Sequence, residues 1–81
     1  MTTHAIKCRP EFFEGLVDGT KTAEVRRNDR FYRVGDRLIL HEFYAYRRGM
    51  TGRIQERIIS RVDDLHSAGI DGFVLLSFAH S

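Results

Sequence analysis

A dense run of charged and hydroxyl side chains occupies residues 19–30 of this 81-residue chain. Thr22, Glu24 and Arg26 would share one face of a strand, and Lys21 precedes them. Lys21, Thr22 and Glu24 are the catalytic candidates, because a threonine hydroxyl beside an unprotonated amine can act as nucleophile and base. The same groups could instead bind a ligand, with the carboxylate accepting from an exocyclic amine and the cations holding phosphate. The alternative is a surface Glu24–Arg26 pair that contributes little stability.

The next segment combines a turn with cations and aromatic rings. Asn28 and Asp29 form a turn signal, in which Asp29 could bond its own backbone. Asn28, Arg30 and Phe31 are candidate ligand-binding residues, because an arginine plane and the rings of Phe31 and Tyr32 can clamp an unpaired base. The alternative places Phe31 in the core and Tyr32 or Arg33 in solvent.

A second group interleaves aromatic and cationic residues at a predicted hairpin loop, residues 45–52. Tyr44 precedes the loop, Arg47 and Arg48 lie within it, and Arg53 follows it. These four residues are candidates for tracking a nucleic-acid backbone. The alternative is an exposed hairpin tip that only keeps the chain soluble.

The net charge is only +2, but it is unevenly distributed. Residues 21–37 hold six Lys or Arg against three acids, and residues 45–61 hold five Arg against one acid. Lysine occurs only at Lys7 and Lys21, so the basic surface is mainly arginine, whose planar fork suits phosphate and base edges. The two basic blocks predict an anion-binding surface, and the alternative is a solvated arginine-rich strand face.

Several classes of protein and site are disfavoured. No apolar run approaches the ~20 residues of a membrane span, and no signal sequence begins the chain, so we expect a cytoplasmic protein without membrane contact. The single cysteine, Cys8, cannot form an intramolecular disulfide, which agrees with a reducing compartment. The four histidines lack metal-ligand spacing, and no phosphate-loop or nucleophile-elbow pattern occurs, so neither a metal nor a cofactor is expected.

One short helix is predicted at residues 10–18. Pro10 suits the first helical position, and Gly19 suits a left-handed end. The apolar residues between them have a one-sided helical spacing, whereas Gly15 weakens the helix, so packing must hold it.

Alternating and β-favouring residues predict strands. In the second strand, Ala23 and Val25 should face the core, and in the returning strand Ile54, Ile58 and Val62 should share one face. The last apolar run should be covered on both faces. The expected strands cover residues 4–8, 21–27, 37–44, 53–62 and 73–78, and residues 63–72 are expected to form a loop that can include one helical turn.

These elements predict one domain, residues 1–81, of the α+β class and mainly β. Hairpin-type connections favour a small, strongly bent and mainly antiparallel sheet of five or six strands. Such a sheet can close into a barrel, with the short helix closing one end.

The order of these motifs resembles the ASCH group of the PUA-like superfamily, and most closely its small phage and bacterial branch of predicted RNA-binding proteins of unknown function. The resemblance covers nearly the whole chain. The matching motifs are the segment of residues 19–30, the turn Val34-Gly35-Asp36, the strand residues Leu38-Ile39-Leu40, the hairpin residues Met50-Thr51-Gly52-Arg53 and the final run Gly72-Phe73-Val74-Leu75-Leu76-Ser77.

This resemblance implies a PUA-like β-barrel with a pocket beside the helix that holds RNA or a modified nucleoside. One ASCH branch resembles amidohydrolases of N-acylated cytidine that use a lysine, a threonine and a glutamate. Lys21 matches the lysine, but Glu24 occupies the place of the threonine. The glutamate of those hydrolases belongs to a later loop, where this chain has only aspartates. The resemblance therefore implies binding more strongly than hydrolysis.

We therefore predict RNA or nucleotide binding through a pocket lined by Lys21, Thr22, Glu24 and Arg26. One alternative is a hydrolase of amidohydrolase type acting on a modified nucleoside. Another is a phage-type accessory domain that binds a protein. Steep salt dependence would separate phosphate binding from a mostly apolar protein interface.

Overall fold

The computed structural model describes residues 1–46 and 49–79. The helix predicted at residues 10–18 and the strand predicted at residues 37–44 are both confirmed. A short helical turn lies within residues 63–72, as expected. The returning strand is longer than predicted, because it begins inside the expected hairpin loop. In chain order the elements are β1 (Thr3–Cys8), α1 (Pro10–Asp18), β2 (Ala23–Arg27), β3 (Arg37–Tyr44), β4 (Gly49–Asp64), η1 (His66–Ala68) and β5 (Phe73–Ala79).

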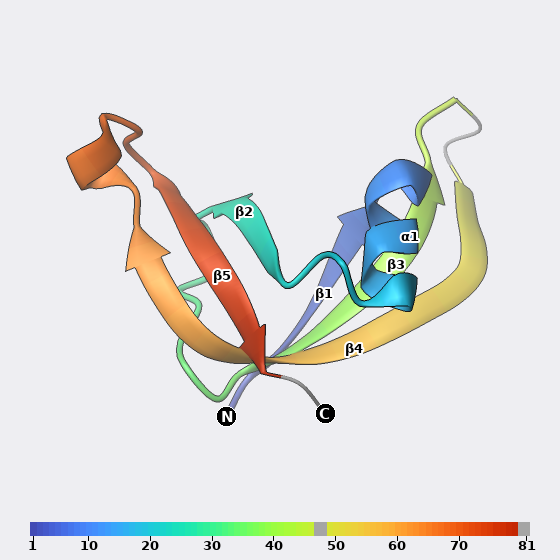
Figure 1. The fold of residues 1–81 in the computed structure, drawn as a ribbon, viewed down its shortest axis with the longest axis horizontal. Helices are drawn as coiled ribbons and strands as arrows, with labels where there is room; N and C mark the ends of the chain where they lie inside the picture. The colour runs from blue at the N-terminus through green and yellow to red at the C-terminus, as the bar shows by residue number, and fades with distance from the viewer. Residues whose placement is uncertain (47–48, 80–81) are drawn as a thin grey trace.

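The strands form one five-stranded sheet in the order β1-β3-β4-β5-β2. β1 pairs with β3 in parallel, and the other neighbours are antiparallel. The long strand β4 sweeps through the middle and pairs with β3 along its first half and with β5 along its second half (Figure 1). The sheet is thereby curled into a half-barrel, and the predicted mainly β fold with one short helix is confirmed.

The curled sheet leaves β1 and β2 at its two edges, and arginine side chains connect these edges. Arg26 Nη1 in β2 donates a 3.2 Å hydrogen bond to the carbonyl oxygen of Lys7 in β1. Arg30 Nη1, just after β2, donates a 2.6 Å hydrogen bond to the carbonyl oxygen of Ala5. These bonds satisfy backbone acceptors that an edge strand otherwise exposes.

The helix lies against the concave side of the sheet (Figure 1). Pro10 occupies its first turn, and Gly19 ends it in the left-handed conformation at φ 83°. Phe13 and Leu16 are fully buried, while Phe12 and Val17 remain about half exposed. The core beneath the helix comprises Ile6, Cys8, Phe13, Leu16, Tyr32, Leu38, Leu40, Ile59, Val74 and Leu76.

Two predictions of strand faces are wrong. Val25 is 55% exposed, whereas its neighbour Glu24 is buried. The cause is the pairing of β2 with β5, which places Glu24 beside the fully buried Leu76. Ile54 and Ile58 are exposed, whereas Val62 packs against the core, so these three residues do not share one face.

In β4 it is Ile59, at 1% exposure, that enters the core. Register explains this, because Leu38 and Leu40 of β3 are buried and their partners in β4 are Arg57 and Gln55. The concave face of β4 before Ile59 is therefore polar. Polar residues are tolerated there because they bond to the helix and to one another.

Three further observations concern which residues are buried. Tyr32 is buried, whereas Phe31 is 81% exposed, so the alternative that put Phe31 in the core is wrong. In β1, where apolar residues are expected to be buried, the polar His4 is buried with Ile6 and Cys8, and Ala5 is exposed. In β5 only Val74 and Leu76 are fully buried, so the strand is not covered on both faces.

Candidate ligand-binding site

A buried carboxylate organises the cations of the predicted site. Lys21 Nζ lies 2.9 Å from Glu24 Oε2, and Arg26 Nη1 lies 3.5 Å from Glu24 Oε1. The Glu24 side chain is 10% exposed, so both ion pairs are largely shielded from solvent. Lys21 and Arg26 thus neutralise one buried charge, and the cluster is a charge network more than a nucleophile with its base.

Cys8 lies close enough to this cluster to feel its charges. Burial and, to a smaller extent, the negative charge of Glu24 raise the pKa of the Cys8 thiol to about 11. The thiol donates a 3.7 Å hydrogen bond to the carbonyl oxygen of Arg9. Since only the thiolate is a strong nucleophile, Cys8 is an inert core residue at neutral pH.

The turn after α1 fixes the position of Lys21. Its backbone N–H donates a 2.9 Å hydrogen bond to the carbonyl oxygen of Gly15, so the chain folds back against the helix. A Cβ atom on Gly15 would lie only 2.9 Å from Lys21 Cβ, which explains why a glycine is needed inside the helix. Asp18 Oδ1 accepts from both the N–H and the hydroxyl of Thr20, and these bonds lower the pKa of Asp18.

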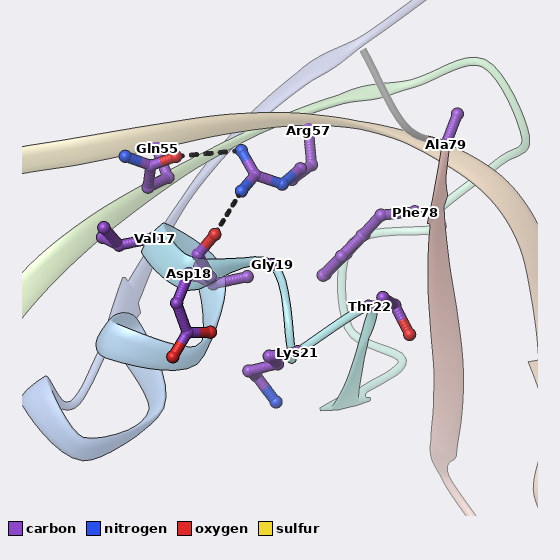
Figure 2. Close-up of a pocket in the computed structure, with 10 residues that line it drawn as sticks. Val17, Asp18, Gly19, Lys21, Thr22, Gln55, Arg57, Phe78 and Ala79 are labelled. Carbon is purple, nitrogen blue, oxygen red and sulfur yellow. Dashed lines mark hydrogen bonds between the residues drawn. The ribbon is translucent and has the colours of Figure 1, made fainter.

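Lys21 and Thr22 line a cavity of about 270 Å³ beside the end of the helix (Figure 2). Figure 2 shows the Phe78 ring extending from β5 toward the turn that carries Lys21. Polar groups from β4 form the wall beside the helix. The complete lining is Leu16, Val17, Asp18, Gly19, Lys21, Thr22, Gln55, Arg57, Phe78 and Ala79.

Arg57 and Gln55 are cavity residues that the sequence did not reveal. Arg57 Nη2 donates a 2.7 Å hydrogen bond to the carbonyl oxygen of Leu16, and Nη1 donates a 3.0 Å bond to Gln55 Oε1. The first bond satisfies one of the carbonyls that the end of a helix leaves unpaired. Their alternation with Ile59 along β4 was a usable signal, but their charge and polarity pointed to solvent.

The structure divides the other predicted site residues among separate places. Glu24 and Arg26 lie outside the lining of the cavity, although Glu24 holds the Lys21 amine that borders it. Asn28, Arg30 and Phe31 belong to the loop between β2 and β3, which contributes nothing to that lining. Arg47 and Arg48 lie outside the described residues.

Tyr44 lies near the start of α1 and not near Lys21. It borders a second cavity, of about 510 Å³, formed between the helix start and the hairpin end of β3. Its lining is Arg9, Pro10, Glu11, Tyr44, Ala45 and Tyr46.

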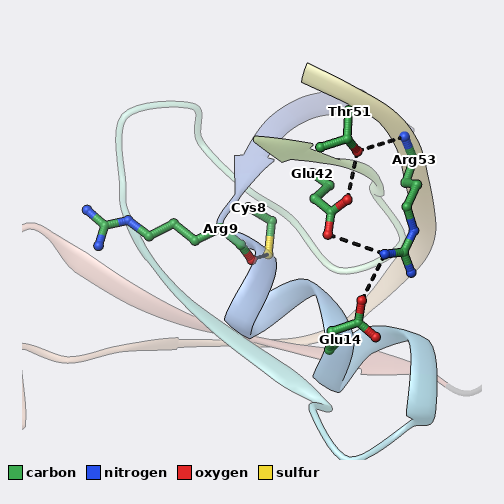
Figure 3. A network of polar contacts seen from close by, with 6 residues as sticks. All are labelled: Cys8, Arg9, Glu14, Glu42, Thr51 and Arg53. Carbon is green, nitrogen blue, oxygen red and sulfur yellow. Dashed lines mark hydrogen bonds and ion pairs between the residues drawn. The ribbon is translucent and has the colours of Figure 1, made fainter. Parts of the chain in front are cut away.

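Arg53 belongs to a network that fastens the hairpin to the helix (Figure 3). Its Nη1 lies 2.8 Å from Glu14 Oε1 in α1 and 3.4 Å from Glu42 Oε2 in β3. Thr51 Oγ1 donates a 2.7 Å hydrogen bond to Glu42 Oε1, and Glu42 is only 3% exposed. The Arg53 guanidinium also lies 4.9 Å from the centre of the Phe13 ring. These contacts give Arg53 a structural role.

Comparison with known proteins identifies the family. Residues 3–78 match the family described as "Domain of unknown function (DUF3850)". The chain belongs to this family. It is 42% identical over 74 residues to a protein of Escherichia phage P2 described as "Uncharacterized 12.9 kDa protein in GpA 3'region". The match covers 90% of this chain and 64% of the phage protein, so the chain spans somewhat less than two thirds of that relative's length.

Two findings concern the DUF3850 domain over residues 1–46 and 49–79. No helix in these ranges is long and apolar enough to cross a membrane. No three His, Cys, Asp or Glu side chains in the same ranges come together as a group that could hold a metal ion.

Proposed function

We propose that this DUF3850 domain binds a nucleotide or an RNA nucleotide unit in the cavity beside the helix. We further propose that its half-barrel is of the ASCH, PUA-like type that its sequence resembles. The observation that carries the proposal is the meeting of Lys21, Thr22, Arg57 and Phe78 around one opening. Cations, a hydroxyl and an aromatic ring are the groups that recognise phosphate, base edge and base face respectively.

The size of the cavity limits the ligand. At about 270 Å³ it lies just below the ~300 Å³ at which pockets for drug-sized molecules begin. One base or nucleoside suits this volume better than a folded RNA element. Phe78 offers a surface for stacking, and the Gln55 amide and Thr22 hydroxyl lie in the same lining for hydrogen bonds to base edges.

Glu24 and Arg26 support this site indirectly. The 2.9 Å pair between Lys21 Nζ and Glu24 Oε2 fixes the lysine at the edge of the cavity, and Arg26 holds the other oxygen of the same carboxylate. The cation that faces a ligand is thereby ordered before binding, which reduces the entropy lost on association. We assign Glu24 and Arg26 positioning roles.

Hydrolysis is less well supported than binding. A threonine nucleophile needs a nearby group that accepts its proton, but the Lys21 amine is engaged by Glu24, and Glu24 stands where the related hydrolases have threonine. A purified sample is therefore expected to leave N-acylated cytidine intact.

A pair of lysine variants tests the proposal. Lys21→Gln should weaken nucleotide binding by an amount typical of a charge-assisted contact, about 1.5–3 kcal/mol. Lys7→Gln is the matched control, because Lys7 lies on β1 with its amine 4.7 Å from the centre of the Phe43 ring and outside the cavity. Titration of nucleoside monophosphates at two salt concentrations measures both, and the wild-type affinity should fall at the higher salt.

A second pair of variants is needed because Lys21→Gln removes one of the two cationic partners of the buried Glu24 and can therefore destabilise the fold. Thr22→Val alters an exposed residue of the cavity, and Thr3→Val makes the same change on an exposed position of β1. The first should weaken binding and the second should not. Binding that is absent at low salt, or reduced equally by the cavity and control variants, would contradict the proposed function.

A further inference from the structure

Phe31 has a backbone conformation that disfavours its own side chain. Its φ is +49°, and among the described residues it is the only one other than glycine with a positive φ. A bulky aromatic residue in the left-handed region is a steric outlier, and such strain persists only where neighbouring structure holds it. The ring is nevertheless 81% exposed, so no burial of apolar surface compensates for this strain.

The residues after Phe31 are firmly anchored. Tyr32 is buried, and its ring centre lies 4.7 Å from that of His4. Asp36 Oδ2 accepts a 3.1 Å hydrogen bond from the N–H of Arg33 and contacts His4 Nε2 at 2.9 Å. With Tyr32 turned into the core, Phe31 is left facing solvent.

The residues before Phe31 are anchored as well. The N–H of Asn28 donates a 2.8 Å hydrogen bond to the carbonyl oxygen of Gly72, and Arg30 reaches the carbonyl oxygen of Ala5. Because a carbonyl is neutral, this bond fixes the Arg30 guanidinium without neutralising its charge. A fixed cation therefore directly precedes the exposed ring in the chain.

The surroundings indicate the kind of partner. Residues 26–37 hold five arginines against two aspartates, and one of these, Asp36, is buried in its own hydrogen-bond network. An exposed aromatic ring in a cationic segment suits a polyanion that also carries flat apolar groups. Single-stranded nucleic acid has this chemistry, because its bases stack on aromatic rings and its phosphates attract arginine.

We propose that Phe31 is a stacking platform for one base of a single-stranded nucleic acid, with Arg30 beside it for the adjoining phosphate. The β2–β3 loop is drawn apart from α1 in Figure 1, and none of its residues lines the helix cavity. The protein would then bind a strand at two places, not only a free nucleotide. This inference extends the proposed function but depends on different residues, so either can fail alone.

Fluorescence anisotropy with unstructured RNA and DNA decamers tests the platform. Phe31→Ala should weaken decamer binding about 5- to 150-fold, the range measured for loss of one stacked base. Phe31→Tyr should retain the affinity, because it keeps the ring. Val34→Ala is the matched control, since Val34 is an exposed apolar residue of the same loop. The two decamers show whether RNA or DNA is preferred.

Two further measurements separate the platform from the helix cavity and from a structural role. Binding of a mononucleotide should be unaffected by Phe31→Ala, whereas Thr22→Val should weaken it. Phe31→Asn should raise the melting temperature while weakening decamer binding, because asparagine tolerates the left-handed region. Decamer affinity equal in wild type and Phe31→Ala, or a lowered melting temperature for Phe31→Asn, would overturn the inference and assign the ring to a protein contact or to the fold.

Discussion

Gly15 should control how closely the Lys21 turn approaches the helix. It lies inside α1, where alanine is favoured over glycine by about 1 kcal/mol. A Cβ atom at this position would meet Lys21 Cβ at 2.9 Å, and ordinary contact begins near 3.4 Å. Lys21 Cβ is attached directly to the backbone, so the whole turn would have to retreat by about 0.5 Å, from 2.9 to 3.4 Å.

The magnitude follows from these two opposing effects. Overpacking a tight contact costs about 1–3 kcal/mol, and the helical preference for alanine returns about 1 kcal/mol. Gly15→Ala should therefore lower the free energy of unfolding by about 0–2 kcal/mol. In a Lys21→Gly background the opposing Cβ is gone, and the same substitution should stabilise the protein by about 1 kcal/mol.

A double-mutant cycle measured by urea denaturation isolates the contact. The wild type, the two single variants and the double variant together give a coupling energy. Both proteins that carry Lys21→Gly lack the Lys21–Glu24 ion pair, so the loss of this pair cancels in the coupling energy. We expect a coupling of about 1–3 kcal/mol, equal to the relieved overlap. If Gly15→Ala stabilises both backgrounds equally, the Lys21 turn does not constrain the helix and the reasoning is wrong.

Two further predictions concern buried carboxylates. Glu42→Gln should lower the free energy of unfolding by about 1–3 kcal/mol, because it disturbs a buried acceptor of Thr51 and Arg53. Glu14 is the 60% exposed partner of the same arginine, so Glu14→Gln should lower the free energy of unfolding by less than about 1 kcal/mol in parallel urea titrations. Asp36 has a pKa lowered from 3.8 to about 2, chiefly by its bond to His4. Its ionised form therefore stabilises the fold above about pH 4, and this contribution should disappear between pH 4 and 2, whereas Asp36→Asn should show a flatter decline over that window.

The helix and its ends were predictable because their signals are local. Pro10 at the start and Gly19 at the end act within one turn of the chain, and both have the predicted conformations. The strand at residues 37–44 was predictable for a similar reason, since its β-favouring residues are contiguous. The position of the Lys21 turn beside the helix followed from the same glycine.

The faces of β2 and β4 were not predictable, because alternation marks two faces but not which of them is inside. Even spacing placed Ile54, Ile58 and Val62 on one face, yet the first two are exposed and Val62 packs against the core that contains Ile59. The register shift after Ile59 also breaks strict alternation along β4. In β2, Glu24 lies on the inner face and Val25 on the outer face. The buried Glu24 carboxylate is tolerated there because it has two cationic partners.

Arginine content predicted a nucleic-acid surface, but the structure uses several of these arginines internally. Arg26 and Arg30 bond to carbonyls of β1, Arg57 bonds to the end of α1, and Arg53 joins two carboxylates. A count of basic residues cannot separate such roles, because all of them favour the same side chain with several donors.

What remains informative is the chemical environment of each cation. Arg57 and Arg30 donate to neutral oxygens, so each keeps a positive charge that an anion can still approach. Arg53, by contrast, contacts two carboxylates and is already neutralised. Arg57 also lines the same cavity as Phe78, and Arg30 directly precedes Phe31 in the chain. If nucleic acid is the ligand, substitutions at Arg57 and Arg30 should reduce the salt dependence of binding more than substitutions at Arg53.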